Sequence, residues 1–131
     1  KIFLPDGTEV WLNSASKLTY STNYNAKNRE VKLEGEGYFK VAEDKTRPFI
    51  VTTSSITVQA LGTEFNVKSY PEEGIIETTL VEGSVKVNTI ENKTAQTKDL
   101  VLKPNDKLTF VKKTGKLYLS SDSLDMAGKD N

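Results

Sequence analysis

Short runs of alternating hydrophobic and polar residues repeat along most of the chain. Such period-two alternation, rich in valine, isoleucine, phenylalanine and threonine, is typical of half-buried β-strands. No window carries the i, i+3, i+4, i+7 spacing of an amphipathic helix. The pattern therefore predicts an all-β fold with little or no helix and about a dozen short strands. The apolar pairs are Val31 and Leu33, Phe39 and Val41, Phe49 and Val51, Ile56 and Val58, Phe65 and Val67, Val85 and Val87, and Leu108 and Phe110.

Turn-forming residues separate these runs where hairpins would require them. Asp-Gly or Asn-Gly pairs between apolar runs are strong hairpin signals, and Asn, Asp and Pro favour other reversals. The chain carries Asp6-Gly7, Glu82-Gly83, Asn105-Asp106 and Thr114-Gly115 at such places.

Many short strands in one domain must stack or close to cover their apolar faces. We expect an antiparallel β-sandwich of jelly-roll type over residues 1–119, with a closed barrel as the alternative. Residues 120–131 lack alternation and are polar, so they are predicted to form a tail or linker. The predicted core consists of Leu33, Phe39, Val41, Phe49, Val51, Val58, Phe65, Val67, Leu80, Val85 and Val87.

The charge balance argues against a nucleic-acid surface. The 131 residues include 18 basic and 18 acidic side chains, so the formal net charge is zero. Binding to phosphates requires a basic excess, and no run of Lys and Arg supplies one locally. We therefore expect no nucleic-acid partner.

The sequence contains no histidine and no cysteine. Their absence removes the imidazole base of Ser or Cys nucleophiles, the thiolate nucleophile, and the usual zinc ligands. No apolar run approaches the roughly 20 residues of a membrane helix, so no direct membrane contact is expected. We expect no cofactor and no catalytic metal, and any calcium or sodium ion would be held by surface carboxylates and water.

Glu34 and Glu36 are the first candidates for chemistry. Residues i and i+2 of a strand share a face, with Cα atoms about 7 Å apart, so their carboxyl groups could approach the separation that glycosidases use. Glycines flank them, however, and no other residues that would form a sugar-binding site are recognised around them. Carboxylates on strands are mostly exposed, which favours a solvent-facing or salt-bridged pair.

Ser14, Ser16 and Lys17 form a second candidate group. A Ser–Lys pair can act as nucleophile and base, but such a motif needs an oxyanion loop that we do not recognise here. Glycine-rich phosphate loops are absent as well. The sequence therefore predicts a protein that is not an enzyme.

Aromatic residues offer a different function, a carbohydrate-binding β-sandwich. Stacking faces for sugars could come from Trp11, Tyr20, Tyr24, Tyr38 and Tyr70. Trp11 and Tyr38 lie in apolar strand positions, which favours core packing for these two. Direct sugar binding on a glycan array would favour this alternative.

Five stretches, in order, resemble the periplasmic domain of FecR-type anti-sigma factors, in the version common in Bacteroidetes. They cover about 105 residues and keep the order and approximate spacing of each block. Residues 1–119 are accordingly identified as a FecR-like periplasmic β domain. The stretches are LPDGTEVWLNSASKLTY at 4–20, REVKLEGEGYFKVAEDKTRPFIV at 29–51, VQALGTEFNVKSY at 58–70, TLVEGSVKV at 79–87 and LKPNDKLTF at 102–110.

The resemblance implies a signal-relay role. Such proteins hold an extracytoplasmic-function sigma factor through a cytoplasmic region, cross the inner membrane once, and place this domain in the periplasm. Their outer partner is the signalling domain of a TonB-dependent transducer that reports uptake of an iron chelate or a glycan. The sequence begins at Lys1, so we expect a segment of a longer protein. The family has no catalytic set of residues to assign.

The resemblance also makes the strand of Glu34 and Glu36 structural. We expect Glu36 to pair with Arg29 or to cap a neighbouring turn. Two other segments bear on partner contacts. Residues 91–99, ENKTAQTKD, are charged and predicted to form a guarded loop. Residues 74–81, GIIETTLV, are mostly apolar or β-branched and would be either a central strand or, at an edge, an acceptor for a partner strand.

Overall fold

The computed structural model describes residues 1–21, 23–24, 28–90 and 99–121. Twelve β-strands and no helix are formed by these described residues, which confirms the all-β prediction. The strands are β1 Ile2–Phe3, β2 Glu9–Leu12, β3 Lys17–Thr19, β4 Arg29–Lys40, β5 Phe49–Thr52, β6 Ile56–Ala60, β7 Glu64–Ser69, β8 Ile75–Glu82, β9 Val85–Thr89, β10 Asp99–Leu102, β11 Asp106–Val111 and β12 Lys116–Ser121.

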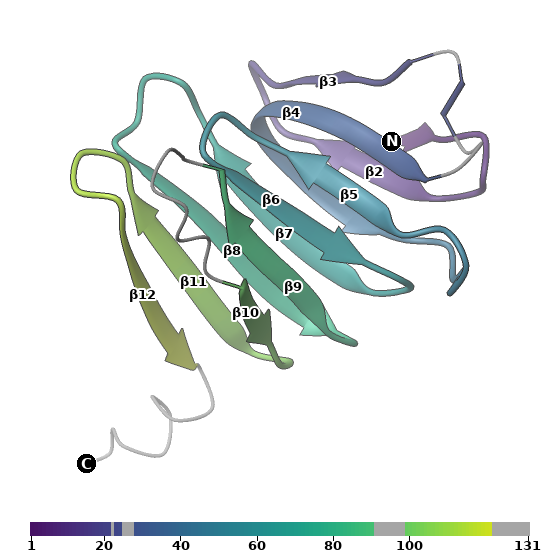
Figure 1. Ribbon diagram of the computed structural model, residues 1–131. Helices are drawn as coiled ribbons and strands as arrows, with labels where there is room; N and C mark the ends of the chain where they lie inside the picture. The colour runs from purple at the N-terminus through teal and green to yellow at the C-terminus, as the bar shows by residue number, and fades with distance from the viewer. Residues whose placement is uncertain (22, 25–27, 91–98, 122–131) are drawn as a thin grey trace.

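The strands form two layers that share β4 (Figure 1). The first layer has the order β1-β2-β4-β7-β8-β11-β12, and the second has the order β3-β4-β5-β6-β9-β10. The carboxyl half of β4 pairs with β2 and β7, and its amino half pairs with β3 and β5. One long strand thus folds a continuous sheet back on itself, with the core between the layers.

Gly35 lies where β4 passes from one layer to the other. Its φ is +104°, in a region that residues with a side chain rarely adopt. A Cβ atom at this position would lie 2.2 Å from Ser16 Oγ and 2.7 Å from Ser16 Cα. Glycine is therefore required both by the backbone conformation and by the close approach of the loop before β3.

One strand pair departs from the antiparallel prediction. β4 and β5 are parallel, with Arg29 opposite Phe49 and Lys32 opposite Thr52, while the other pairs among the described strands are antiparallel. The reason is the fold in β4: its two ends lie in different layers, and residues 41–48 cross between the layers. The chain then enters β5 beside the start of β4 and runs in the same direction.

The core confirms the apolar pattern. Each of the eleven predicted core residues is buried, and Val10, Val31, Ile56, Ile76, Leu102 and Leu108 join them. The ring of Phe39 stacks on Phe65 at 5.3 Å between centroids and lies 5.8 Å from Phe49 in a tilted arrangement. Phe39 and Phe65 come from the first layer and Phe49 from the second, so this aromatic cluster joins the two layers.

The segment at 74–81 is central. β8 pairs with β7 on one side and β11 on the other, so the edge interpretation is wrong and the central-strand interpretation is confirmed. Residues 91–98 of the predicted guarded loop lie outside the described residues, and Asp99 begins β10. β12 continues to Ser121, and the remainder of the predicted tail also lies outside the described residues.

Candidate functional site

Glu34 and Glu36 point outward from β4 but belong to different layers. Glu34 stands opposite Lys17 of β3, and Glu36 stands opposite Lys68 of β7. A shallow surface depression is lined by Glu36 but not by Glu34. The structure therefore does not bring the two carboxylates to one cavity, as a pair of catalytic acids would require.

The carboxylate of Glu36 is fixed by two asparagines. Its Oε1 accepts a hydrogen bond from Asn13 Nδ2 at 3.0 Å, and its Oε2 accepts one from Asn66 Nδ2 at 2.8 Å. These bonds, that of Asn13 first, lower the pKa of Glu36 and keep it ionised. A general acid needs the opposite shift, towards neutral pH.

The predicted Glu36–Arg29 pair is wrong, since Arg29 pairs with Asp6 at 2.9 Å. Arg29 and Glu36 are seven residues apart and have opposite parity in β4, so one faces the core and the other faces solvent. The other expectation, that Glu36 caps a neighbouring turn, is closer to the observed contacts. Asn13, which binds the Glu36 side chain, begins the loop after β2 and also donates its backbone N–H to the Glu36 carbonyl at 3.0 Å.

Ser16 has a structural role. Its Oγ accepts the Glu36 N–H at 2.8 Å and lies within 3.5 Å of the hydroxyl of Tyr70, which in turn donates to the Ser14 carbonyl at 3.0 Å. Lys17 is exposed on β3, and no hydrogen bond between Ser16 and Lys17 is found among the described residues. The group fastens the loop before β3 to the bend in β4.

A buried ionic cluster, which the sequence interpretation did not identify, closes one end of the sandwich. The guanidinium of Arg29 is fully buried, and it lies 5.8 Å from the ring centroid of Phe49. Each of its three nitrogens donates to an oxygen, so the charge is fully hydrogen-bonded. The acceptors are Arg47 O at 2.8 Å from Nε, Asp6 Oδ2 at 2.9 Å and Ala42 O at 2.6 Å from Nη1, and Asp44 O and Leu61 O at 3.3 Å from Nη2.

Asp6 is the anionic partner of this cluster. Burial alone would raise its pKa, but hydrogen bonds from Arg29 and Thr8 outweigh burial and lower the pKa. The hydroxyl of Tyr24 donates to Asp6 Oδ1 at 3.3 Å, and burial followed by the Asp6 charge raises the pKa of Tyr24. The parity of Arg29 with Val31 and Leu33 was the sequence signal that could have located this buried charge.

The core assignment of Trp11 and Tyr38 is wrong. Trp11 is 38% exposed, and its ring meets that of Tyr38 edge-on at 5.7 Å on the outer face of the first layer. The strand parity explains the error, because Val10 and Phe39 occupy the adjacent inward positions. Burial and a hydrogen bond to Glu64, 2.5 Å long, raise the pKa of Tyr38 to about 12.

The other predicted aromatic residues lie at two further places. Tyr24 is buried near Asp6, Tyr20 is exposed beside it with ring centroids 5.3 Å apart, and Tyr70 lies by Ser16. Tyr20 and Tyr24 line one depression of about 350 Å³. Trp11 and Tyr38 line another, of about 250 Å³, with Leu12, Asn13, Glu36 and Asn66. One face of Trp11 is approached by the ammonium of Lys1 at 5.1 Å.

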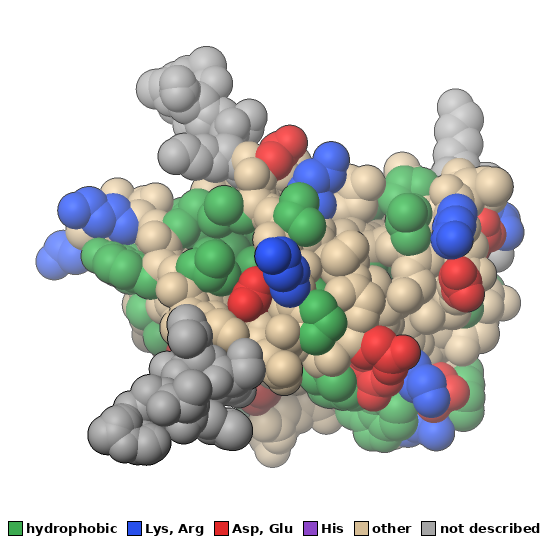
Figure 2. All heavy atoms as spheres, turned by 90° about the horizontal axis from the view of Figure 1, so that it is seen from below, with side chains coloured by type: hydrophobic (Ala, Val, Ile, Leu, Met, Phe, Trp, Pro, Cys, Tyr) green, Lys and Arg blue, Asp and Glu red, His purple; other side chains and the backbone are tan. Residues whose placement is uncertain are grey.

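The described surface carries charged side chains of both signs. Figure 2 shows basic and acidic side chains interspersed with apolar ones at the end of the sandwich that bears the β8–β9 and β10–β11 turns. Within the described ranges, no group of three or more acidic, His or Cys residues could hold a metal ion. No helix able to cross a membrane occurs in the same part of the chain.

Fold and surface together define an all-β domain of two layers joined through one bent strand. The family model described as "FecR protein" matches residues 1–86, and the chain therefore belongs to the FecR family. The predicted resemblance to FecR-type proteins is thus confirmed. None of the curated proteins matches the sequence.

Two crystal structures of candidate anti-sigma factors from Parabacteroides distasonis ATCC 8503 have the same fold. The structure at 1.65 Å resolution is 33% identical with a TM-score of 0.82, and the match covers 92% of this chain and 54% of that chain. The structure at 2.50 Å resolution is 31% identical with a TM-score of 0.83, and the match covers 97% and 59%. The present chain thus spans little more than half the length of these relatives.

Proposed function

We propose that this chain is the relay domain of an anti-sigma factor. The observation that carries the proposal is its membership of the FecR family, together with the fold it shares with two candidate anti-sigma factors. The described side chains support a role by contact rather than by catalysis. Glu36, the part-buried carboxylate of β4, is held ionised by hydrogen bonds from two asparagines. Ser16, from the predicted Ser–Lys group, is engaged in a structural hydrogen bond with the Glu36 N–H.

In the finer proposal, the domain lies in the periplasm as part of a single-pass inner-membrane protein. It contacts the signalling domain of a TonB-dependent outer-membrane transducer that takes up an iron chelate or a glycan. The sigma factor is held by a cytoplasmic region outside this sequence. The neutral composition fits a protein partner better than an extended polyanion.

Deletion of residues 1–121 from the full-length protein tests the relay role. In the native host, a reporter for the sigma-dependent promoter should no longer respond to the inducing compound, because the outer signal has no receiver. The matched control is the Glu34→Gln variant of this exposed residue, which should respond normally. An unaltered response after the deletion would remove the proposed function.

The contact itself is measured by calorimetry between the purified domain and the signalling domain of the transducer encoded beside it. Saturable binding is expected. An alkaline phosphatase fusion after residue 121 of the full-length chain tests the location, since this reporter is active only outside the cytoplasm. An inactive, correctly produced fusion would contradict the periplasmic proposal.

A second candidate function is sugar binding at the depression beside Trp11. It is favoured by the exposed ring and by the polar side chains of Asn13, Glu36 and Asn66 around it. Trp11 is the only tryptophan in the chain, so its fluorescence reports on this site alone. Saturable changes on titration with a glycan, lost in Asn66→Ala, would support this function, and an unchanged spectrum across a glycan panel would remove it.

A further inference from the structure

β12 is the longest of the four strands that end the two layers within the described residues. It has six residues, whereas β1, β3 and β10 have two, three and four. β12 pairs only with β11 among the described strands. Along residues 116–120, its other side therefore presents backbone N–H and C=O groups to which a further strand could bind.

The side chains of β12 do not protect this edge. Natural edge strands are usually guarded by a central lysine, a proline or a bulge. β12 has no proline, its register with β11 is regular, and its one charged residue, Lys116, is the first residue of the strand. Tyr118 is 56% exposed and Leu119 is 55% exposed.

The exposed apolar groups lie on both faces of β12. Leu119 stands opposite Leu108, which is buried, so Leu119 points to the inner side of the layer. Tyr118 stands opposite Thr109 and points to the outer side. Leu117, also on the inner side, packs against the core. An added strand would place alternate side chains beside Leu117 and Leu119 on one face and beside Tyr118 on the other.

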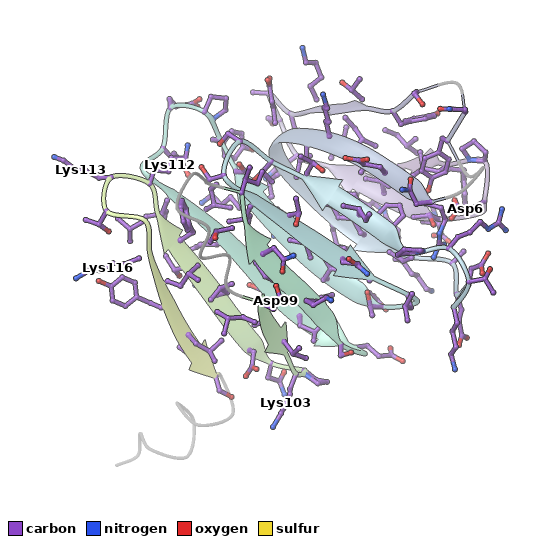
Figure 3. The ribbon with its side chains drawn as sticks, in the orientation of Figure 1. Asp6, Asp99, Lys103, Lys112, Lys113 and Lys116 are labelled. Carbon is purple, nitrogen blue, oxygen red and sulfur yellow. The ribbon has the colours of Figure 1, made fainter. Side chains whose placement is uncertain are left out.

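The turn that leads into β12 is basic. Lys112, Lys113 and Lys116 project from the β11–β12 hairpin, far from Asp6 at the other end of the molecule (Figure 3). The ammonium of Lys112 donates to the Tyr70 carbonyl at 3.1 Å, whereas Lys113 and Lys116 are exposed. The open edge thus has cations at one end and Leu117, Tyr118 and Leu119 in its middle.

We propose that β12 accepts an extended segment of a protein partner by β-strand addition. The segment has acidic residues beside Lys113 and Lys116 and apolar residues beside Leu117 and Leu119. Main-chain hydrogen bonds supply binding, and the alternate side chains supply specificity. The inference deepens the proposed function, and it rests on that function only for the identity of the partner.

A second copy of this chain fits the edge less well. Two β12 strands related by a two-fold axis at Tyr118 would place Lys116 opposite Ser120 of the other copy. The residues of β12 include no carboxylate, so such a pair leaves the lysines without a counter-charge. An acidic partner segment supplies that charge, which is the reason for preferring a different protein.

A labelled peptide of sequence Thr-Val-Tyr-Val-Asp-Asp tests the proposal with the purified 131-residue chain. In antiparallel pairing it places valines beside Leu117 and Leu119 and an aspartate beside Lys116. Amide chemical shifts should move in residues 116–120. The double variant Lys113→Glu, Lys116→Glu should weaken binding about tenfold, a difference of about 1.4 kcal/mol. A second peptide, Thr-Val-Tyr-Val-Lys-Lys, should bind the double variant more tightly than the wild type.

Matched variants separate the edge from other apolar surface. Leu119→Asp should abolish peptide binding, whereas Leu61→Asp, at an exposed leucine between β6 and β7, should leave it unchanged. Shifts confined to other strands, or equal binding of both peptides, would overturn the proposal. A dimer in light scattering that Leu119→Asp dissociates would replace the partner with a second copy. If the peptide does not bind but deletion of residues 1–121 abolishes the promoter response, the open-edge proposal is removed and the relay function remains.

Discussion

Arg29 shares the parity of Val31 and Leu33, so β4 carries a charge into the interior along with two apolar side chains. The guanidinium is retained there because the loops that meet at this end offer carbonyl groups and the Asp6 carboxylate. An isolated buried charge would be expensive, whereas a fully hydrogen-bonded one can be tolerated. At the scale of the residue, whether a polar side chain is tolerated in this core depends on the hydrogen-bond partners that it finds there.

Replacing Asp6 with Asn should destabilise the domain by about 3–5 kcal/mol at neutral pH, because the buried Arg29 charge loses its counter-ion. The folded pKa of Asp6 lies below its ordinary value of 3.8, so its contribution is present above that pH and is lost as pH falls through the folded pKa. Urea unfolding from pH 7 to pH 2 should therefore show the difference from the wild type shrinking in acid.

The exposed Glu34 provides the control for Asp6, since Glu34→Gln should change stability by less than about 0.5 kcal/mol at each pH. A difference between Asp6→Asn and the wild type that is constant with pH would contradict the assignment of the effect to the ionised carboxylate.

Thr78 illustrates the opposite case. Its side chain is fully buried in β8, and its hydroxyl has no hydrogen-bond partner among the described residues. Thr78→Val keeps the shape and removes the unpaired group, so it should stabilise the domain by about 1 kcal/mol in urea unfolding. Thr57→Val, at a part-exposed position of β6, should have little effect. A destabilised Thr78→Val would mean that the hydroxyl is bonded.

At the scale of the element, β4 determines the architecture because it belongs to both layers. Its bend depends on Gly35, whose backbone conformation and contact with Ser16 exclude a side chain. The parallel β4–β5 pair follows from the same bend. A twelve-residue strand that remained straight would leave the second layer without the strand that lies between β3 and β5.

Gly35→Ala should cost about 3 kcal/mol or more, because the strained φ alone costs about 1–3 kcal/mol and the methyl group overlaps Ser16. Gly74→Ala is the control, since a Cβ there meets no heavy atom within 4 Å. Thermal unfolding of both variants measures the difference. Equal midpoints would show that β4 does not depend on glycine at its bend.

Proline substitution distinguishes central from edge strands. Thr78→Pro should unfold the domain, because β8 has a partner on each side and its N–H is used whichever way it points. On β12, consecutive N–H groups point alternately to β11 and to solvent. One of Leu119→Pro and Ser120→Pro should therefore retain a folded circular dichroism spectrum. Unfolding by both would contradict the open edge.

At the scale of the whole molecule, stability comes from one core between two layers. Phe39, Phe49 and Phe65 are fully buried and join the layers through their rings. Such an interior is close-packed. Removing one ring therefore loses the free energy of burying that ring and also leaves a cavity. The open side of β12 lies outside this core, so a partner strand can bind there without unfolding the domain.

Phe65→Ala should destabilise the domain by about 3–5 kcal/mol, as expected for a buried aromatic residue. Leu61→Ala, at an exposed position, should cost far less. Chemical denaturation followed by Trp11 fluorescence measures both, since Trp11 is the only tryptophan. A loss below about 1 kcal/mol for Phe65→Ala would mean that the side chain does not lie between the layers.

The strands and most of the core could be predicted from the sequence. Alternation identifies which side chains share a face, and the eleven predicted core residues are indeed buried. Trp11 shows the limit of the same reasoning. Hydrophobicity suggested the interior, but the register with β4 places Val10 inward and Trp11 outward. Parity along a strand is therefore a better guide to burial than the character of a single residue.

The sequence by itself determined the all-β class, the strand positions and the FecR resemblance, because these depend on local spacing and on blocks of residues in order. Only the tertiary structure decided the partners of Arg29 and Glu36, the central place of β8 and the open edge at β12. Such contacts join residues far apart in the chain: Arg29 and Asp6 are 23 residues apart. Their choice depends on how β4 bends and how loops cross between layers, which no local pattern encodes.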